Sequence, residues 1–342
     1  MMRTSVIFKK PYAIELVQSP LPVPGEEEVL IKTRFSAISA GTELLVYRGR
    51  FPSTLPVDAT IPALVRPFDY PLAYGYASVG RVVEVGRSAP KELLDRLVFC
   101  FHPHESHYTI RQDRLIMLPD DIEPADAALS ATMETAVNFL MDGRPVIGEN
   151  VVIFGQGIVG LLTTALLARL PLGNLMALDP CRLRRKTAEI AGARTVLDPD
   201  AANLHDEVEK HLKSAGSEKG ADLIYELSGN PAALNQAIGI AGPGARIVIG
   251  SWYGTQKAQL DLGGSFHRNR IRLISSQVSS LAPQFSARWT KGRRMNVALE
   301  MVRQLNPGRF VTHRIDVRQA AKAYELLDKR AHEAMQVLLT YE

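Results

Sequence analysis

Three glycines in one short segment have the spacing of a dinucleotide-binding turn. They lie in Gly155-Gln156-Gly157-Ile158-Val159-Gly160, between the apolar run 150–154 and a helix-like run that continues through Leu161. In such a turn the first glycine permits the tight bend, the second lets the backbone approach a pyrophosphate, and the third lets helix and strand pack closely. The free N–H groups and the positive dipole end of the helix then face the phosphates. The segment therefore predicts a dinucleotide site.

One acidic residue indicates which dinucleotide is bound. Asp179 stands at the end of the next apolar run, 175–178. A carboxylate at this place accepts hydrogen bonds from the ribose diol of NAD and repels the 2′-phosphate of NADP. Arg182 and Arg184 follow it and could offset that repulsion. NAD(H) is therefore the preferred cofactor, and NADP(H) is the alternative.

Alternating strands and helices must position these residues. Strands are expected at 150–154, 175–179, 194–197, 221–227, 245–250 and 271–276, and helices at 158–170, 182–191, 203–214 and 231–241. This alternation predicts an α/β fold with a doubly wound parallel sheet and right-handed crossovers, assigned to residues 136–282. Residues 1–135 read mainly as short strands and proline-rich loops, and the tail 283–342 lacks a core of its own. We expect the tail to fold onto the N-terminal part as one β-rich domain.

Composition indicates which kinds of partner and which cellular compartment are expected for this protein. The 342 residues contain 46% hydrophobic and 22% charged residues, which is typical of a globular protein of about two domains. The net charge of +4 is diffuse and carries no nucleic-acid-binding motif, so no nucleic acid is expected as a partner. No apolar stretch is long enough for a membrane span. Cys100 and Cys181 are the two cysteines, and the start lacks a signal-peptide run, which together indicate a cytoplasmic protein.

The whole arrangement resembles the medium-chain dehydrogenase/reductase superfamily, which includes the zinc alcohol dehydrogenases. Besides the glycine turn, the resemblance rests on Ala37-Ile38-Ser39-Ala40-Gly41-Thr42-Glu43-Leu44, which looks like the active-site segment that usually has a cysteine before Gly-Thr-Asp. It rests also on Gly75-Tyr76-Ala77-Ser78-Val79-Gly80, where the family has Gly-His-Glu-x-x-Gly, and on the closing segment 312–327. The resemblance implies a Rossmann domain inserted in a GroES-like catalytic domain, and an NAD(P)-dependent, alcohol dehydrogenase-like enzyme.

The zinc ligands of that family are not matched. The resemblance places Ala40 where the ligand cysteine stands and Tyr76 where the ligand histidine stands, so that only Glu134 is left at the third position. One carboxylate cannot hold Zn²⁺, which needs three protein ligands and a water. The four-cysteine structural zinc lobe is missing too, because Cys100 is alone in its region. The chain is therefore expected to be zinc-independent, with no metal ligands.

A displaced metal site is the open alternative. Cys100, His102 and His104 would lie on one face of a regular strand, where they could bind a metal ion. Pro103 interrupts regular strand geometry, so the same histidines could instead pack, or could face the substrate.

Three residues are predicted to do the chemistry without zinc. Hydride transfer needs a proton partner for the substrate oxygen, and hydrogen-bond donors must then polarise that oxygen. Thr42 occupies the proton-relay hydroxyl position of the family, and Tyr76 brings a phenol to the position of the zinc-binding histidine. Glu134 could orient either of them, or act as a base with its pKa raised by burial. In the alternative interpretation Thr42 closes a turn, Tyr76 fills the vacated pocket, and Glu134 pairs with an arginine.

The resemblance also completes the predicted cofactor and substrate sites. Gly250-Ser251-Trp252 stands where the backbone of the family meets the nicotinamide, and Ser228 and Arg184 are counted with it as cofactor-binding residues. The loop from Arg48 to Tyr74 is long and carries apolar residues among its prolines, which predicts a small-molecule substrate larger than ethanol. A homodimer is expected through 271–278, where this family often pairs its sheets.

The predicted function is hydride transfer between a nicotinamide and an alcohol/carbonyl substrate. Two alternatives stay open. One is reduction of an activated C=C bond, as in the zinc-free quinone and enoyl reductases of the superfamily, which typically use NADPH. The other is a dinucleotide-binding protein without turnover.

Overall fold

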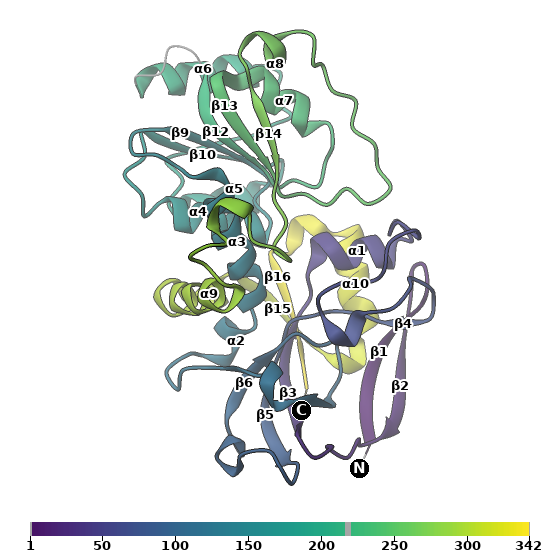
Figure 1. Cartoon of the computed structure of the whole chain (residues 1–342). Helices are drawn as coiled ribbons and strands as arrows, with labels where there is room; N and C mark the ends of the chain where they lie inside the picture. Colours follow the sequence, from purple (N-terminus) through teal and green to yellow (C-terminus); the bar gives the residue numbers. More distant parts are fainter. Residues whose placement is uncertain (1, 216–219, 342) are drawn as a thin grey trace. The chain divides into compact units, whose positions relative to one another are not determined.

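The computed structural model describes residues 2–215 and 220–341, which form two compact units (Figure 1). Unit 1 contains residues 2–131 and 302–341, and unit 2 is Thr132–Met301. The sequence placed the second boundary earlier, at 282/283. The observed boundary lies later in the sequence because most of helix α9 (Lys291–Leu305) belongs to unit 2. The buried guanidinium of Arg294 on α9 binds Glu134 and Asn138 on helix α3 (Ser130–Gly143).

Unit 2 contains a six-stranded sheet whose neighbouring strands are all parallel. Its order is β11-β10-β9-β12-β13-β14, so the chain builds outward from β9 in one direction and then continues on the other side of it. This is the doubly wound order, and the predicted fold class is confirmed. The strands are β9 (Asn150–Phe154), β10 (Asn174–Leu178), β11 (Thr195–Leu197), β12 (Ala221–Glu226), β13 (Ala241–Ile249) and β14 (Arg272–Ser275).

Burial explains why these segments became strands and helices. β9 and β10 are buried along their whole length, which is the pattern of central strands covered on both faces. Helix α4 (Ile158–Leu167) is almost entirely buried, whereas α5 (Arg182–Ala191) buries only Ala188 and Ala191 and presents charged residues to solvent. The other helices of unit 2 outside α3 and α9 are α6 (Leu204–Ser214), α7 (Ala233–Ile240) and α8 (Ser265–Arg268).

Unit 1 is mostly β-structure, as expected. A seven-stranded sheet has the order β15-β16-β3-β5-β6-β8, with β7 also paired to β3, and a three-stranded sheet has the order β2-β1-β4. β16 pairs antiparallel with β3, so the C-terminal segment completes the N-terminal sheet. The strands are β1 (Met2–Lys10), β2 (Ala13–Pro20), β3 (Glu28–Ala37), β4 (Leu72–Ala73), β5 (Ser78–Val85), β6 (Leu97–Cys100), β7 (His107–Arg111), β8 (Ile116–Met117), β15 (Val311–Asp316) and β16 (Gln336–Thr340).

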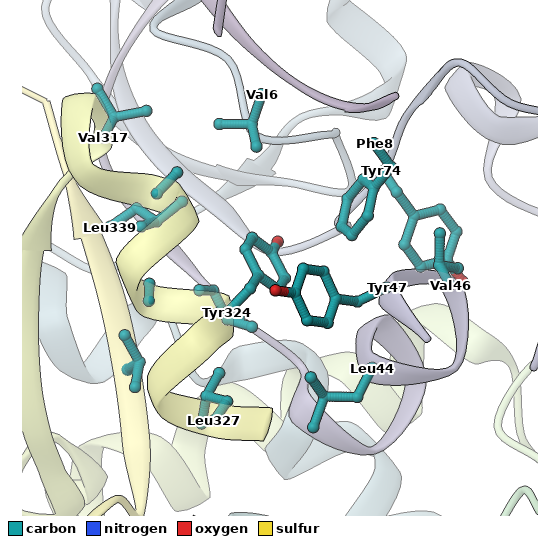
Figure 2. Close-up of a cluster of buried hydrophobic side chains, with 14 of the residues drawn as sticks. Val6, Phe8, Leu44, Val46, Tyr47, Tyr74, Val317, Tyr324, Leu327 and Leu339 are labelled. Carbon is teal, nitrogen blue, oxygen red and sulfur yellow. The ribbon is translucent and has the colours of Figure 1, made fainter. Parts of the chain in front are cut away.

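The core of unit 1 joins helix α1 (Ala40–Tyr47) to helix α10 (Ala320–Lys329) (Figure 2). Tyr324 of α10 points into this core, with its ring centroid 5.0 Å from that of Phe8 and 5.6 Å from that of Tyr47. Its hydroxyl donates to Glu43 on α1 at 2.5 Å. The core therefore also fixes the polar side of α1. A further short helix of unit 1, α2 (Pro124–Ala127), precedes α3.

Among the residues that the structure describes, no helix combines the length and the apolar character that crossing a bilayer requires.

Candidate active site

The glycine turn of unit 2 has three glycines with three different surroundings. Gly155 has φ +90°, and a Cβ there would lie 2.5 Å from the Cα of Ser228. A Cβ on Gly160 would lie less than 3.0 Å from the carbonyl oxygen of Gly155. A Cβ on Gly157 would meet nothing within 4 Å. Two of the glycines are therefore required by the packing of the protein itself, and Gly157 leaves open space at the N-terminus of α4, where a phosphate group fits.

The residues between these glycines connect the turn to the sheet. The backbone N–H of Gln156 donates to Asp179 Oδ2 at 2.8 Å, and its buried side chain accepts a hydrogen bond from Thr164. Ile158 is buried in the first turn of α4, and Val159 packs against the core under β9. The predicted turn residues thus shape the site, and the N–H groups at the start of α4 provide the anion-binding end.

Asp179 lies directly after β10 and is almost fully buried. Its Oδ2 accepts from the N–H of Gln156 and its Oδ1 from the N–H of Cys181, both at 2.8 Å. Each carboxylate oxygen has a second lone pair, so ribose hydroxyls can still be accepted. Arg184 Nη1 lies 3.8 Å from Oδ2 and partly offsets the charge. The residues therefore fit the adenosine half of a dinucleotide, and NAD and NADP are not distinguished by these contacts.

Glu226 is a buried acid in unit 2 that the sequence analysis missed. It ends β12, and its Oε1 accepts from both the backbone N–H, at 2.8 Å, and the hydroxyl of Ser228. Its Oε2 accepts from the hydroxyl of Tyr253 at 2.5 Å. The available signal was a charged residue within the apolar run 221–227, at the same end of its strand as Asp179.

The predicted nicotinamide segment follows β13. Gly250 packs tightly, because a Cβ there would lie less than 3.0 Å from the ring of Phe139 on α3. Ser251 Oγ accepts from the N–H of Gly229 at 2.8 Å, which joins this segment to the loop that contains Ser228. Trp252 is 38% exposed. The loops after β12 and β13 therefore form one hydrogen-bonded edge of the sheet.

In unit 1, the structure brings together three hydroxyl groups, which we call the hydroxyl cluster. The hydroxyl of Tyr76 donates to Ser39 Oγ and lies 3.4 Å from Thr42 Oγ1. All three side chains are partly exposed. Burial raises the pKa of Tyr76, while its hydrogen bonds to Ser39 and Thr42 oppose that rise. Tyr76 therefore stays protonated and available as a donor at neutral pH.

A buried pair, Glu43 and His104, supports this cluster. Glu43 Oε1 accepts from the N–H of Ser39 at 2.7 Å, and its Oε2 lies 3.0 Å from His104 Nε2. Gly75 has φ +102°, and a Cβ there would lie 2.5 Å from the ring of His104. The imidazole of His104 is held on its other side by Ser36 at 2.6 Å. The pair therefore fixes the backbone beside both Ser39 and Tyr76.

The displaced metal site considered above is not formed by its three residues. His104 turns into the core toward Glu43, and His102 stacks on Tyr108 with ring centroids 3.6 Å apart. Burial raises the pKa of the Cys100 thiol to about 12, although its hydrogen bond with Tyr108 opposes that rise. Within residues 2–215 and 220–341, no group of three or more His, Cys, Asp or Glu side chains is arranged to hold a metal ion. The described residues therefore do not support the alternative of a metal site at Cys100, His102 and His104.

Glu134 belongs to unit 2, whereas Tyr76 and Thr42 belong to unit 1. Its Oε1 accepts from Arg294 Nε at 3.1 Å, and Arg294 is 1% exposed. Burial raises the pKa of Glu134, and the charge of Arg294 opposes that rise. The arginine partner explains why a carboxylate is buried here. A catalytic role for Glu134 stays a prediction.

Comparison with known proteins tests the predicted family resemblance. The model of a zinc-binding dehydrogenase family matches residues 159–306. Among curated proteins, L-threonine 3-dehydrogenase of Thermococcus kodakarensis is 26% identical over 278 residues, which cover 72% of this chain and 75% of the relative. The (R,R)-butanediol dehydrogenase of Bacillus subtilis is 26% identical over 301 residues, covering 80% and 82%. The predicted resemblance to the medium-chain dehydrogenase/reductase superfamily is confirmed. The relatives support the predicted enzyme class, an NAD(P)-dependent, alcohol dehydrogenase-like oxidoreductase.

Solved structures of the superfamily share the fold. The chain matches 2R,3R-butanediol dehydrogenase from Bacillus subtilis with a TM-score of 0.81 at 19% identity, covering 99% of this chain and 100% of the other. Galactitol-1-phosphate dehydrogenase from Escherichia coli matches with a TM-score of 0.79 at 18% identity, covering 98% and 99%. The superfamily fold is therefore retained although Ala40 and Tyr76 stand at the positions where the resemblance expects zinc ligands.

Proposed function

We propose that this chain is a zinc-independent dehydrogenase that transfers a hydride between a nicotinamide and an alcohol/carbonyl substrate larger than ethanol. The observation that carries the proposal is the hydroxyl cluster of Tyr76, Ser39 and Thr42, which offers a phenol as hydrogen-bond donor at the position where the resemblance expects a ligand histidine. Two features of unit 2 also support the proposal. The glycine turn has open space at Gly157, and the carboxylate of Asp179 binds the backbone of that turn.

The chemistry requires one hydride and one proton to leave the alcohol. The bound nicotinamide supplies the hydride acceptor. Tyr76 accepts a hydrogen bond from the substrate hydroxyl while its own O–H donates to Ser39 Oγ. As the substrate proton passes to Tyr76, the phenol proton passes to Ser39, and Ser39 releases its proton to solvent. In the opposite direction the single O–H of Tyr76 turns from Ser39 to the carbonyl oxygen, polarises it and supplies the proton, which solvent then replaces through Ser39. Thr42 Oγ1 is a second hydroxyl within reach of the phenol.

The names of the relatives favour a secondary alcohol as substrate. They include an L-threonine 3-dehydrogenase and an (R,R)-butanediol dehydrogenase. In the loop from Arg48 to Tyr74, the rings of Phe51 and Phe68 stack at 4.4 Å and pack on the core of unit 1. This packing accounts for the apolar residues of the loop, and its part in substrate binding stays a proposal. A first substrate screen should therefore contain secondary alcohols and vicinal diols, with enones and quinones to test reduction of C=C bonds.

The zinc-independent mechanism predicts that the purified protein contains well under one zinc per chain. Removal of metal by a chelator should leave turnover on any substrate found in the screen unchanged, because no step depends on a Lewis acid. Elemental analysis by mass spectrometry and assays before and after dialysis against EDTA measure both quantities. Zinc near one per chain that is needed for turnover would contradict the proposal.

Asp179→Asn is expected to lower the affinity for NADH about tenfold relative to that for NADPH. The substitution removes the charge that favours a free ribose diol, and the amide oxygen can keep one backbone hydrogen bond, from Gln156 or Cys181. Any loosening of the turn affects both cofactors equally, so the ratio of the two dissociation constants isolates the ribose contact.

Fluorescence titrations with each cofactor measure that ratio. Asp198→Asn is a matched control, because Asp198 follows the neighbouring strand β11 and binds Arg185 at 2.9 Å. The control should leave the ratio unchanged. If Asp179→Asn also leaves it unchanged, the ribose assignment is wrong.

A further inference from the structure

Glu226 lies at the carboxyl end of β12, beside the point where the strand order of unit 2 reverses. In the strand register it stands between Phe154 of β9 and Ile249 of β13. Ligands of open α/β sheets bind outside the carboxyl ends of the strands at such a switch point. The side chain of Glu226 is fully buried there. A buried carboxylate is stable only when hydrogen-bond donors satisfy it, so Glu226 needs donors in its surroundings.

The donors of Glu226 come from two different loops. Ser228, in the loop after β12, donates its N–H and its hydroxyl to Oε1, and Tyr253, after β13, donates its hydroxyl to Oε2 at 2.5 Å. Burial and the neighbouring carboxylate raise the pKa of Tyr253, which keeps its phenol protonated as a donor. One acid therefore ties together the segments that follow two adjacent strands.

Two further contacts extend this arrangement. The N–H of Gly229 donates to Ser251 Oγ at 2.8 Å, a second link between the same two loops. On the other side, Ser228 packs directly against Gly155, at the start of the glycine turn. Glu226 holds Ser228 in place, and Ser228 contacts the glycine turn that follows β9. Glu226 therefore also influences that turn.

We propose that Glu226 is a positioning residue that holds the loops after β12 and β13 in the arrangement that receives the nicotinamide half of the dinucleotide. The inference rests on the proposed function, namely dinucleotide binding. A doubly wound sheet binds a dinucleotide across the switch point, with one mononucleotide half on each side. Gly157 and Asp179 belong to the β9–β10 side, which leaves the loops joined by Glu226 for the other half.

The test compares NADH with ADP-ribose, which lacks the nicotinamide. Tyr253→Phe removes one hydrogen bond to Glu226 and should weaken NADH binding about tenfold, while ADP-ribose binding changes less than about twofold. Glu226→Gln should act in the same direction, because its amide keeps only one acceptor oxygen for the three donors. Isothermal titration of each ligand into each variant gives the dissociation constants, and thermal unfolding reports whether the variant is folded.

A matched control lies one residue before Glu226. The hydroxyl of Tyr225 is buried and has no hydrogen-bond partner among the residues that the structure describes. Tyr225→Phe therefore removes a phenol oxygen from the same strand without breaking any of the hydrogen bonds described above. This control should bind both ligands as the unmodified protein does.

The outcomes separate the inference from the function on which it rests. Equal weakening of NADH and ADP-ribose by Tyr253→Phe, or no weakening of NADH, overturns the positioning role and leaves dinucleotide binding in place. Failure of the unmodified chain to bind ADP-ribose and NADH at all overturns the proposed function itself. If Glu226→Gln does not fold, Tyr253→Phe still decides the question, because it removes a single oxygen from a side chain that is only half-buried.

Discussion

Gly157→Ala is expected to weaken NADH binding about 100-fold while leaving the free energy of unfolding within about 0.5 kcal/mol of that of the unmodified protein. Gly157 has φ −63° and ψ 179°, which alanine adopts without strain. Apart from its own chain neighbours, the new methyl group would have no atom of the described residues within 4 Å. It would instead occupy the space at the start of α4 through which a pyrophosphate reaches the backbone N–H groups.

Gly160→Ala provides the contrast within the same turn. Its methyl group would lie less than 3.0 Å from the carbonyl oxygen of Gly155, a backbone atom that cannot move without shifting the strand. We expect this variant to lose about 3 kcal/mol of unfolding free energy as well as NADH binding. The two glycines therefore differ in what excludes a side chain: the ligand at Gly157 and the protein at Gly160.

Urea unfolding and NADH titration of the two variants measure these effects. Gly239→Ala serves as control, because a Cβ at this helical glycine of α7 also meets nothing within 4 Å. The control should bind NADH normally and be slightly more stable, since alanine is the better helix former. Normal NADH binding by Gly157→Ala would exclude the N-terminus of α4 as the phosphate site.

The glycine turn could be predicted from the sequence because its determinants are local. Strand, glycines and helix are contiguous from Asn150 to Leu167, and each glycine has a requirement that the spacing alone expresses. Gly157 and Gly160 thus have the surroundings that the motif implies. The alternation of apolar runs likewise predicted all six strands of the unit 2 sheet near their observed positions.

The partners of the polar residues could not be predicted in this way. Glu43 binds Tyr324 across 281 positions of the sequence, and Glu134 binds Arg294 across 160. Such pairs are set by the packing of distant segments, for which a single sequence carries no periodic signal. Ser39 was missed for a related reason, since its proximity to Tyr76 depends on the backbone fixed by Glu43 and His104. Thr42, Tyr76 and Glu134 were therefore visible in the sequence, which also allowed an arginine partner for Glu134 but did not indicate which arginine it is.

Tyr76→Phe is expected to lower kcat about 100-fold on the best alcohol or carbonyl substrate of the screen, with the dissociation constant for NADH unchanged. The substitution removes the phenol oxygen alone, and the half-buried ring keeps its packing on the core of unit 1. Because burial raises the pKa of Tyr76 above its ordinary value of 10.0, the unmodified enzyme keeps this donor protonated up to about that pH. Carbonyl reduction should therefore not lose this donor between pH 7 and pH 9.

The size of the effect distinguishes a chemical role for Tyr76 from simple filling of a vacated metal pocket. If the ring only fills space, phenylalanine is an equivalent residue and kcat stays within about twofold. If the phenol polarises the substrate oxygen, kcat falls while cofactor binding and stability hold, and Ser39→Ala causes a smaller loss because it removes only the group that holds the phenol proton. Tyr12→Phe is the matched control, since it deletes an exposed phenol oxygen of the same unit. Steady-state kinetics with stopped-flow NADH binding measures each quantity, and an unchanged kcat in Tyr76→Phe would leave the metal-free mechanism without its proton donor.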